Sequence, residues 1–222
     1  MPMLALSFAS LVSVALIAAR ILWTSNLKYG YLAWNLFLAW VPLGLAFLAC
    51  DQHEKQAERN WRFYALSGGW LLFFPNAPYI FTDVIHLTTR IYGQFWVDLV
   101  LILLCALTGL VLGFVSLFLM QTLVARRLGR AGGWLFIAAV AGLSGFGIYL
   151  GRFLRFNSWD IVYKPFELCV GVTQLAIRPQ SHPHSLAFPF LFAIFLFIAY
   201  VMLYALTHLR PAPLEITARP VQ

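Results

Sequence analysis

The sequence predicts an all-α fold, a polytopic bundle of transmembrane helices. Of its 222 residues, 62% are hydrophobic and only 10% are charged, whereas soluble domains carry about 25% charged residues. Long apolar runs use up most of the chain, and about 20 apolar residues are enough to cross a bilayer. We therefore expect one transmembrane domain over residues 1–209, with six spans and no soluble domain.

The expected spans follow the apolar runs and are bounded by polar or basic residues. They cover residues 3–23, 31–50, 62–86, 96–124, 134–154 and 186–209. The first run is long and its basic residues follow it, whereas a signal peptide begins with basic residues and has a short apolar core. We expect this first run to be a retained helix.

The third span is interrupted by Pro75 and Pro78, which flank Asn76. A proline removes a backbone donor, and such a break survives in a membrane only where protein or water satisfies the freed groups. The break therefore predicts the wall of a polar cavity. Asp83 and His86 follow one helical turn apart and are the candidate catalytic groups. A second interpretation stays open, in which the prolines end a helix and Asp83 caps the next one.

The fourth and fifth spans each contain two glycines four residues apart, Gly109 with Gly113 and Gly147 with Gly151. Small residues at this spacing let helix backbones approach closely. The spacing predicts that these two spans pack directly on each other, joined by a short basic turn over residues 126–130.

Residues 156–185 are neither fully polar nor long enough in apolar residues to form a further span. Within this interfacial segment, residues 165–177 are expected to form an amphipathic helix on the membrane surface. Residues 210–222 are expected to form a polar C-terminal tail.

Spans three, four and five bring their polar ends to one membrane face if each crosses once. That face would collect Asp83, His86, Arg90, Asp98, Arg152, Arg155, Asn157 and Asp160, with Trp96 and Trp159 beside them.

Arg152 and Arg155 lie three residues apart at the end of the fifth span and need anionic partners in a low dielectric. Two interpretations are open at this point. The arginines form ion pairs with aspartates and lock the helix ends, or they bind a phosphate or carboxylate, which the guanidinium fork matches. The candidate ligand-binding residues are Arg152, Arg155, Asn157, Asp160, Asn76 and Asp98.

The remaining composition narrows the partners. The formal charge of +7 suits the basic loops of a membrane protein and anionic lipid head groups, so nucleic acid is not the expected partner. Cys50, Cys105 and Cys169 match no metal or redox spacing, and we expect neither a metal site nor a cofactor. Besides the lipid bilayer, a homo-oligomer or a membrane protein partner stays open.

Two motifs resemble those of a known family. These are Phe73-Phe74-Pro75-Asn76-Ala77-Pro78-Tyr79, followed by Thr82-Asp83 and His86-Leu87, and the stretch from Gly147 to Asp160 with Trp96 and Asp98 before it. The pattern resembles the bacterial multi-pass family called domain of unknown function 1361. The resemblance implies a bacterial inner-membrane protein and no particular reaction.

Three functions remain open. The first is binding or transport of an anionic small molecule or lipid head group, since broken helices beside ionisable groups form substrate sites in transporters. The second is a membrane enzyme acting on a lipid or isoprenoid phosphate, and the third is a non-catalytic assembly subunit. Clustered arginines at 126–130 favour both termini in the cytoplasm.

Overall fold

The computed structural model describes residues 2–55, 61–89, 92–177 and 184–207, and the described chain is helical without strands. This confirms the predicted all-α bundle. The expected tail over residues 210–222 lies outside the described residues, as does Arg90. The elements are α1 (Pro2–Thr24), η1 (Leu27–Tyr29), α2 (Gly30–Lys55), α3 (Trp61–Phe73), α4 (Asn76–Tyr79), η2 (Ile80–Thr89), α5 (Tyr92–Phe153), α6 (Asp160–Tyr163), α7 (Pro165–Ile177) and α8 (His184–Thr207).

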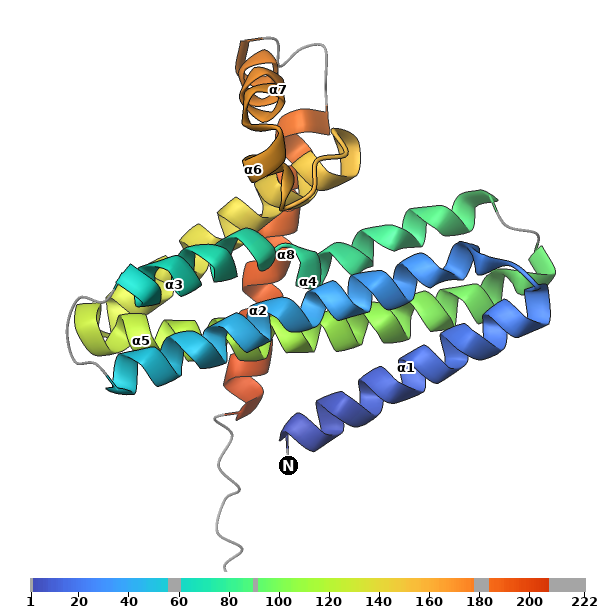
Figure 1. Ribbon diagram of the computed structural model, residues 1–222, viewed down its shortest axis with the longest axis horizontal. Helices are drawn as coiled ribbons and strands as arrows, with labels where there is room; N and C mark the ends of the chain where they lie inside the picture. The colour runs from blue at the N-terminus through green and yellow to red at the C-terminus, as the bar shows by residue number, and fades with distance from the viewer. Residues whose placement is uncertain (1, 56–60, 90–91, 178–183, 208–222) are drawn as a thin grey trace, which may run out of the picture.

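The third expected span is broken, as the two prolines predict. The chain passes from α3 through the single turn α4 into the 3-10 helix η2. Together these three elements run alongside α2 and the first half of α5 (Figure 1). We call α3, α4 and η2 the broken passage.

The long helix α5 folds back on itself at Gly129, whose φ of 76° and ψ of 177° lie outside helical values. Glycine alone adopts such angles readily. The two halves meet near this turn, where a Cβ atom built on Gly133 would lie 3.0 Å from the Cβ of Ala125. The expected fourth and fifth spans therefore do pack on each other, with the basic turn between them.

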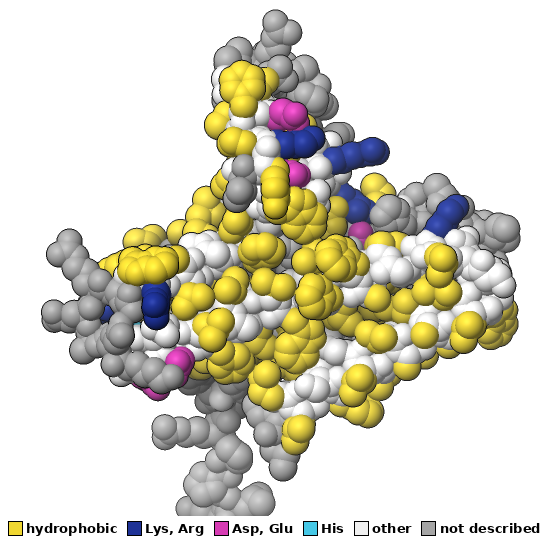
Figure 2. Space-filling view, in the orientation of Figure 1, with side chains coloured by type: hydrophobic (Ala, Val, Ile, Leu, Met, Phe, Trp, Pro, Cys, Tyr) yellow, Lys and Arg dark blue, Asp and Glu magenta, His cyan; other side chains and the backbone are white. Residues whose placement is uncertain are grey.

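Within the described parts of the chain, four helices are long and apolar enough to cross a membrane. They are Met3–Thr24, Leu27–Glu54, Gln94–Phe153 and Ala187–Thr207, and the third of these is the helix that folds back at Gly129. Apolar side chains cover much of the visible face of the bundle, with few charges (Figure 2). The chain is thus an integral membrane protein.

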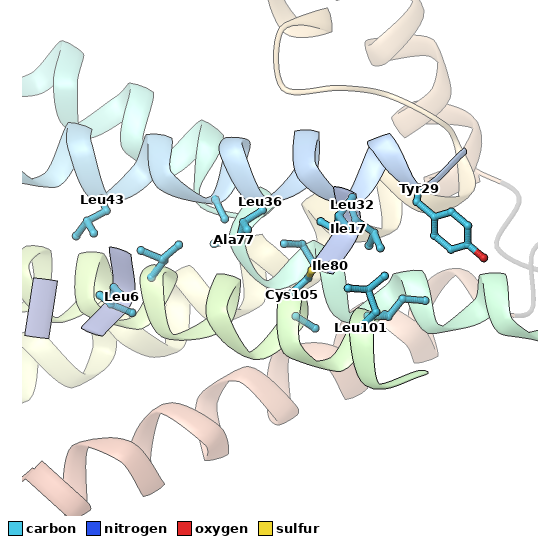
Figure 3. Close-up of a cluster of buried hydrophobic side chains, with 14 of the residues drawn as sticks. Leu6, Ile17, Tyr29, Leu32, Leu36, Leu43, Ala77, Ile80, Leu101 and Cys105 are labelled. Atoms are coloured by element: carbon cyan, nitrogen blue, oxygen red, sulfur yellow. The ribbon is translucent and has the colours of Figure 1, made fainter. Parts of the chain in front are cut away.

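Two apolar clusters form the core. One joins α1, α2, the start of α5 and the broken passage, and includes Leu36, Ala77, Ile80 and Cys105 (Figure 3). The other joins α2, α3, both halves of α5 and α8. Because residues of the broken passage belong to both clusters, the break lies in the interior of the bundle.

The last helix, α8, crosses α5 where both backbones come close. A Cβ atom on Gly145 would overlap the carbonyl oxygen of Pro189 in α8. Steeply crossed helices can approach this closely only where a side chain is missing. Gly145 therefore sets the crossing point.

Between α5 and α8 the short helices α6 and α7 stand away from the bundle (Figure 1). We call them the arm. Apolar side chains of the arm are exposed, among them Tyr163 and Phe166, each 79% exposed. This pattern fits the expected surface helix over residues 165–177.

Candidate functional site

Side chains supply hydrogen bonds at the break between α3 and α4, where helical backbone hydrogen bonds are missing. The Asn76 side-chain amide donates to the carbonyl of Phe73 at 3.0 Å and to the hydroxyl of Ser158 at 2.9 Å. That hydroxyl in turn donates to the carbonyl of Leu72 at 3.1 Å. The carbonyls of Leu72 and Phe73, on the last turn of α3, thereby gain hydrogen-bond donors, which a break inside a membrane protein needs. Ser158, in the loop after α5, ties that loop to the break.

Both glycine pairs face the break and not each other. Cβ atoms built on Gly113 and Gly147 would lie 2.9 Å from the Cβ of Ala77 and 3.0 Å from Cγ of Pro75. Gly109 and Gly151 approach the same passage in the same way, at the carbonyl of Ala77 and the ring of Tyr79. The expectation that the glycine pairs join spans four and five was wrong in this respect, since each pair makes room for the broken passage.

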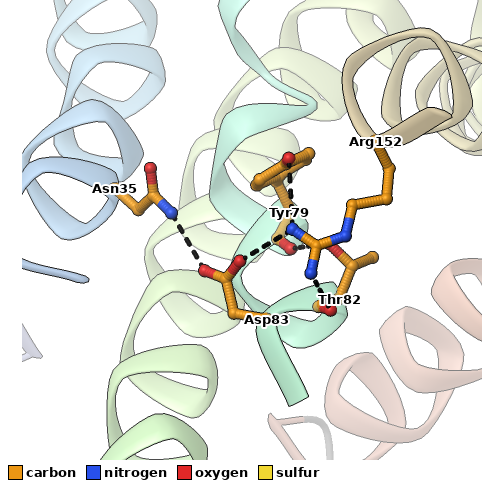
Figure 4. A network of polar contacts seen from close by, with 5 residues as sticks. All are labelled: Asn35, Tyr79, Thr82, Asp83 and Arg152. Atoms are coloured by element: carbon orange, nitrogen blue, oxygen red, sulfur yellow. Dashed lines mark hydrogen bonds and ion pairs between the residues drawn. The ribbon is translucent and has the colours of Figure 1, made fainter. Parts of the chain in front are cut away.

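Asp83 and Arg152 form a buried ion pair beside the break. Arg152 Nη1 lies 3.0 Å from Asp83 Oδ1, and the side chains are 13% and 2% exposed. Asn35 on α2 donates to the other carboxylate oxygen, Oδ2, at 2.9 Å (Figure 4). The pair thus joins the end of α5 to the broken passage, and Asn35 adds α2.

The guanidinium of Arg152 is fixed by further contacts. Its Nη2 donates to the carbonyl of Thr82 at 2.7 Å, and its Nη1 lies 3.4 Å from the hydroxyl of Tyr79 (Figure 4). The guanidinium carbon also lies 5.6 Å from the centre of the Tyr79 ring, within cation–π range. A guanidinium has five N–H donors, and these contacts with described residues use three of them. The Nε hydrogen and one Nη2 hydrogen have no hydrogen bond to a described residue.

The chain after Arg152 turns sharply and leaves the other predicted residues apart from this pair. Arg155 is exposed and has a φ of 59°, in the left-handed region. Asp160 accepts a hydrogen bond from the backbone N–H of Asn157 at 2.6 Å, closing the loop that begins the arm. Of these three residues, Asn157 lines the cavity described below.

Asp98 belongs to a second buried cluster. It pairs with Arg20 of α1 at 2.8 Å and accepts a hydrogen bond from the hydroxyl of Tyr29 at 2.9 Å. Arg20 also donates to Gln94 at 3.0 Å. The sequence interpretation had grouped Asp98 with Arg152 and Arg155, whereas the structure places it against α1. The sequence does not single out Arg20, because a basic residue at the end of an apolar run is also what the boundary of a span looks like.

The other candidate catalytic residue, His86, lies in η2, and its side chain falls outside the described residues. Whether His86 lies beside Asp83 as the predicted catalytic pair thus stays a prediction. Within the part of the chain that is described, no three carboxylate, imidazole or thiol side chains gather closely enough to hold a metal ion.

The ion pair lies in the wall of a cavity of about 800 Å³ between α2, the broken passage, the end of α5 and the arm. Its charged and amide-bearing lining residues are Lys28, Asn35, Asn76, Asp83, Arg152 and Asn157. Charged side chains gather where the arm meets the bundle (Figure 2). The break predicted this cavity, while Lys28, Tyr79 and Ser158 were not foreseen as parts of it.

The fold and the polar cavity define a class of protein, an integral membrane helical bundle with a charged cavity beside a broken helix. A comparison with protein families matches residues 34–199 to the family described as protein of unknown function (DUF1361). The chain belongs to this family. Comparisons with curated proteins and with solved structures return no match.

Proposed function

We propose that the cavity binds an anionic ligand, which is either a small molecule or a lipid head group. This binding is either the whole function of the site or one step in transport of the ligand. The charge of the cavity carries the proposal. Two cations, Lys28 and Arg152, line it with one described carboxylate, Asp83, so the described lining has a formal charge of +1. Anions are attracted to such a concave, partly buried positive site.

The fixed position of Arg152 supports the same function. Its contacts with Asp83, Tyr79 and Thr82 hold the guanidinium in place, so little side-chain freedom is lost when a ligand binds. The carboxylate of Asp83 balances the charge of Arg152. Asp83 also accepts a hydrogen bond from Asn35. It therefore keeps one partner when the guanidinium of Arg152 forms hydrogen bonds with a ligand.

Native mass spectrometry of the protein extracted with its surrounding lipid tests this function. Lys28→Gln is the best variant, because Lys28 is exposed at the edge of the fold and its loss should not unfold the bundle. Arg130→Gln is the matched control, since Arg130 is an exposed cation at the turn of α5, outside the cavity. We expect anionic adducts on wild type and on Arg130→Gln, reduced several-fold on Lys28→Gln. Equal adducts on all three proteins would contradict the proposal.

We also propose that the protein lies in a bacterial inner membrane with both termini in the cytoplasm. Arg126, Arg127 and Arg130 are exposed at the turn of α5, and short basic loops favour the cytoplasmic side. In that orientation the arm faces outward. Cys169, which is exposed on α7, would then react with a membrane-impermeant maleimide in intact spheroplasts, and Cys169→Ser would abolish the labelling. Reaction of Cys169 only after lysis would reverse the orientation.

A further inference from the structure

The cavity is lined by apolar side chains as well as by charged ones. Leucine and isoleucine side chains from four parts of the fold, which we call the apolar wall, are Leu38, Leu72, Leu150, Ile161 and Leu168. Two of them, Ile161 and Leu168, belong to the arm. The side chains of this wall would not contribute to the binding of a small, fully hydrated anion. Burying apolar surface is favourable only when it is covered by other apolar surface, which such an anion lacks.

The size of the cavity also exceeds what a simple anion fills. Its volume of about 800 Å³ lies in the range of about 300–1,000 Å³ typical of sites for drug-sized molecules. A bare phosphate would leave most of the apolar wall uncovered. The volume therefore fits a head group together with part of a hydrocarbon chain.

The arm has the side-chain pattern of an interfacial helix and also lines the cavity. Apolar side chains of the arm are exposed next to an exposed ion pair between Lys164 and Glu167. Short helices with this division of side chains lie in the membrane interface. Since Ile161 and Leu168 of the arm also line the cavity, the cavity is within reach of lipid from that side.

We infer that the ligand is an amphiphile with a phosphate head group, an inference that rests on the proposed anion-binding function. The phosphate lies between Lys28 and Arg152, and its hydrocarbon chain lies along Leu38, Ile161 and Leu168. Two cations on different elements, η1 and α5, suit phosphate better than carboxylate, because phosphate offers more acceptor oxygens in more directions.

Four probes separate the head group from the chain. Lysophosphatidic acid with one oleoyl chain carries both, glycerol 3-phosphate carries the phosphate alone, monoolein carries the chain without charge, and oleate carries a carboxylate. Each is titrated into the full-length, delipidated protein in detergent micelles and followed by native mass spectrometry. We expect lysophosphatidic acid to bind at least about tenfold more tightly than the other three probes. A tenfold gain corresponds to burying roughly two methylene groups or to forming one contact between a cation and the phosphate.

A matched pair of variants on α7 locates the chain. Leu168→Asn places an amide in the apolar wall, whereas Val170→Asn makes the same change two residues away, at an exposed position outside the cavity lining. Leu168→Asn should weaken lysophosphatidic acid several-fold and leave glycerol 3-phosphate unchanged. Val170→Asn should leave both unchanged.

Each other outcome overturns the inference in a different way. Equal binding of glycerol 3-phosphate and lysophosphatidic acid, with both weakened by Lys28→Gln, would refute the amphiphile and retain the proposed anion site. Equal binding of monoolein would show that the wall takes any hydrocarbon chain, and equal binding of oleate would refute the phosphate. If neither phosphate probe binds while oleate does, the inference fails and the proposed function stands; if none of the three anionic probes binds, both fail.

Discussion

Breaking the ion pair between Asp83 and Arg152 should destabilise the protein more than any other single change of charge near the cavity. The two substitutions are Asp83→Asn, which keeps the side-chain volume, and Arg152→Gln, which shortens the side chain; each removes one charge. The pair is 3.0 Å apart, with 2% of Asp83 and 13% of Arg152 exposed. Either substitution leaves the other charge buried beside the break.

The expected cost follows from that burial. Removing one partner of a buried pair costs about 3–5 kcal/mol, because an uncompensated charge remains. Arg152 retains some contact with solvent, so we expect the lower end, about 3 kcal/mol for each single variant. The double variant removes both charges at once, and its cost should be close to that of one single variant. The coupling free energy, the sum of the two single costs minus the cost of the double variant, is then about 3 kcal/mol.

The measurement is reversible unfolding in mixed micelles, with sodium dodecyl sulfate as the denaturant and tryptophan fluorescence as the readout. Glu167→Gln serves as the control, because its partner Lys164 is 3.4 Å away and both side chains are more than half exposed. That variant should change the free energy of unfolding by about 0.5 kcal/mol or less.

Two results would refute this reasoning. Single variants that each cost less than about 1 kcal/mol would show that water reaches the pair and screens it. Additive costs in the double variant, with no coupling, would show that the two side chains act separately. In either case the ion pair would not be what joins the end of α5 to the broken passage.

Three further changes test the fold around the cavity. Gly113→Ala should lower the free energy of unfolding by about 1–3 kcal/mol, since its new Cβ would lie 2.9 Å from that of Ala77. Gly142→Ala is the control, because a Cβ there meets open space; it should be neutral or stabilising by up to about 1 kcal/mol. Gly129→Ala should cost about 1–3 kcal/mol in the same unfolding assay, because a φ of 76° and a ψ of 177° suit only glycine. Ser158→Ala should leave a carbonyl of the break unsatisfied, cost about 1–3 kcal/mol and speed proteolysis within the arm; unchanged cleavage would contradict its role as an anchor.

The broken third span could be predicted from the sequence because proline acts locally. Pro75 and Pro78 cannot donate backbone hydrogen bonds, and the structure duly divides the span into α3, α4 and η2. The need for groups that satisfy the freed carbonyls was also predictable. Which side chain does so was not, since Ser158 lies 82 residues beyond Asn76 in the chain.

The pairing of charges could be predicted only in part. A buried arginine at the end of α5 requires a carboxylate, but Asp83, Asp98 and Asp160 all satisfy the same rule in the sequence. Helix packing decides among them, because α1 brings Arg20 to Asp98 and leaves Asp83 to Arg152. Packing likewise decides what a glycine seam meets, since the spacing shows where a backbone can approach and not which backbone does so.

The glycine seams also determine which parts of the molecule can move. The break is enclosed by backbone on two sides, with Ala77 against Gly113 and Pro75 against Gly147. Helix backbone cannot yield as a flexible side chain can, so the broken passage should stay stationary when a ligand enters. The opposite side of the cavity is held across the gap by the hydrogen bond from Asn35 to Asp83, and the arm by those of Ser158. A ligand should therefore enter when α2 or the arm moves relative to the rigid broken passage. A proline break is usually expected to act as the hinge, whereas here it should be the part that stays fixed.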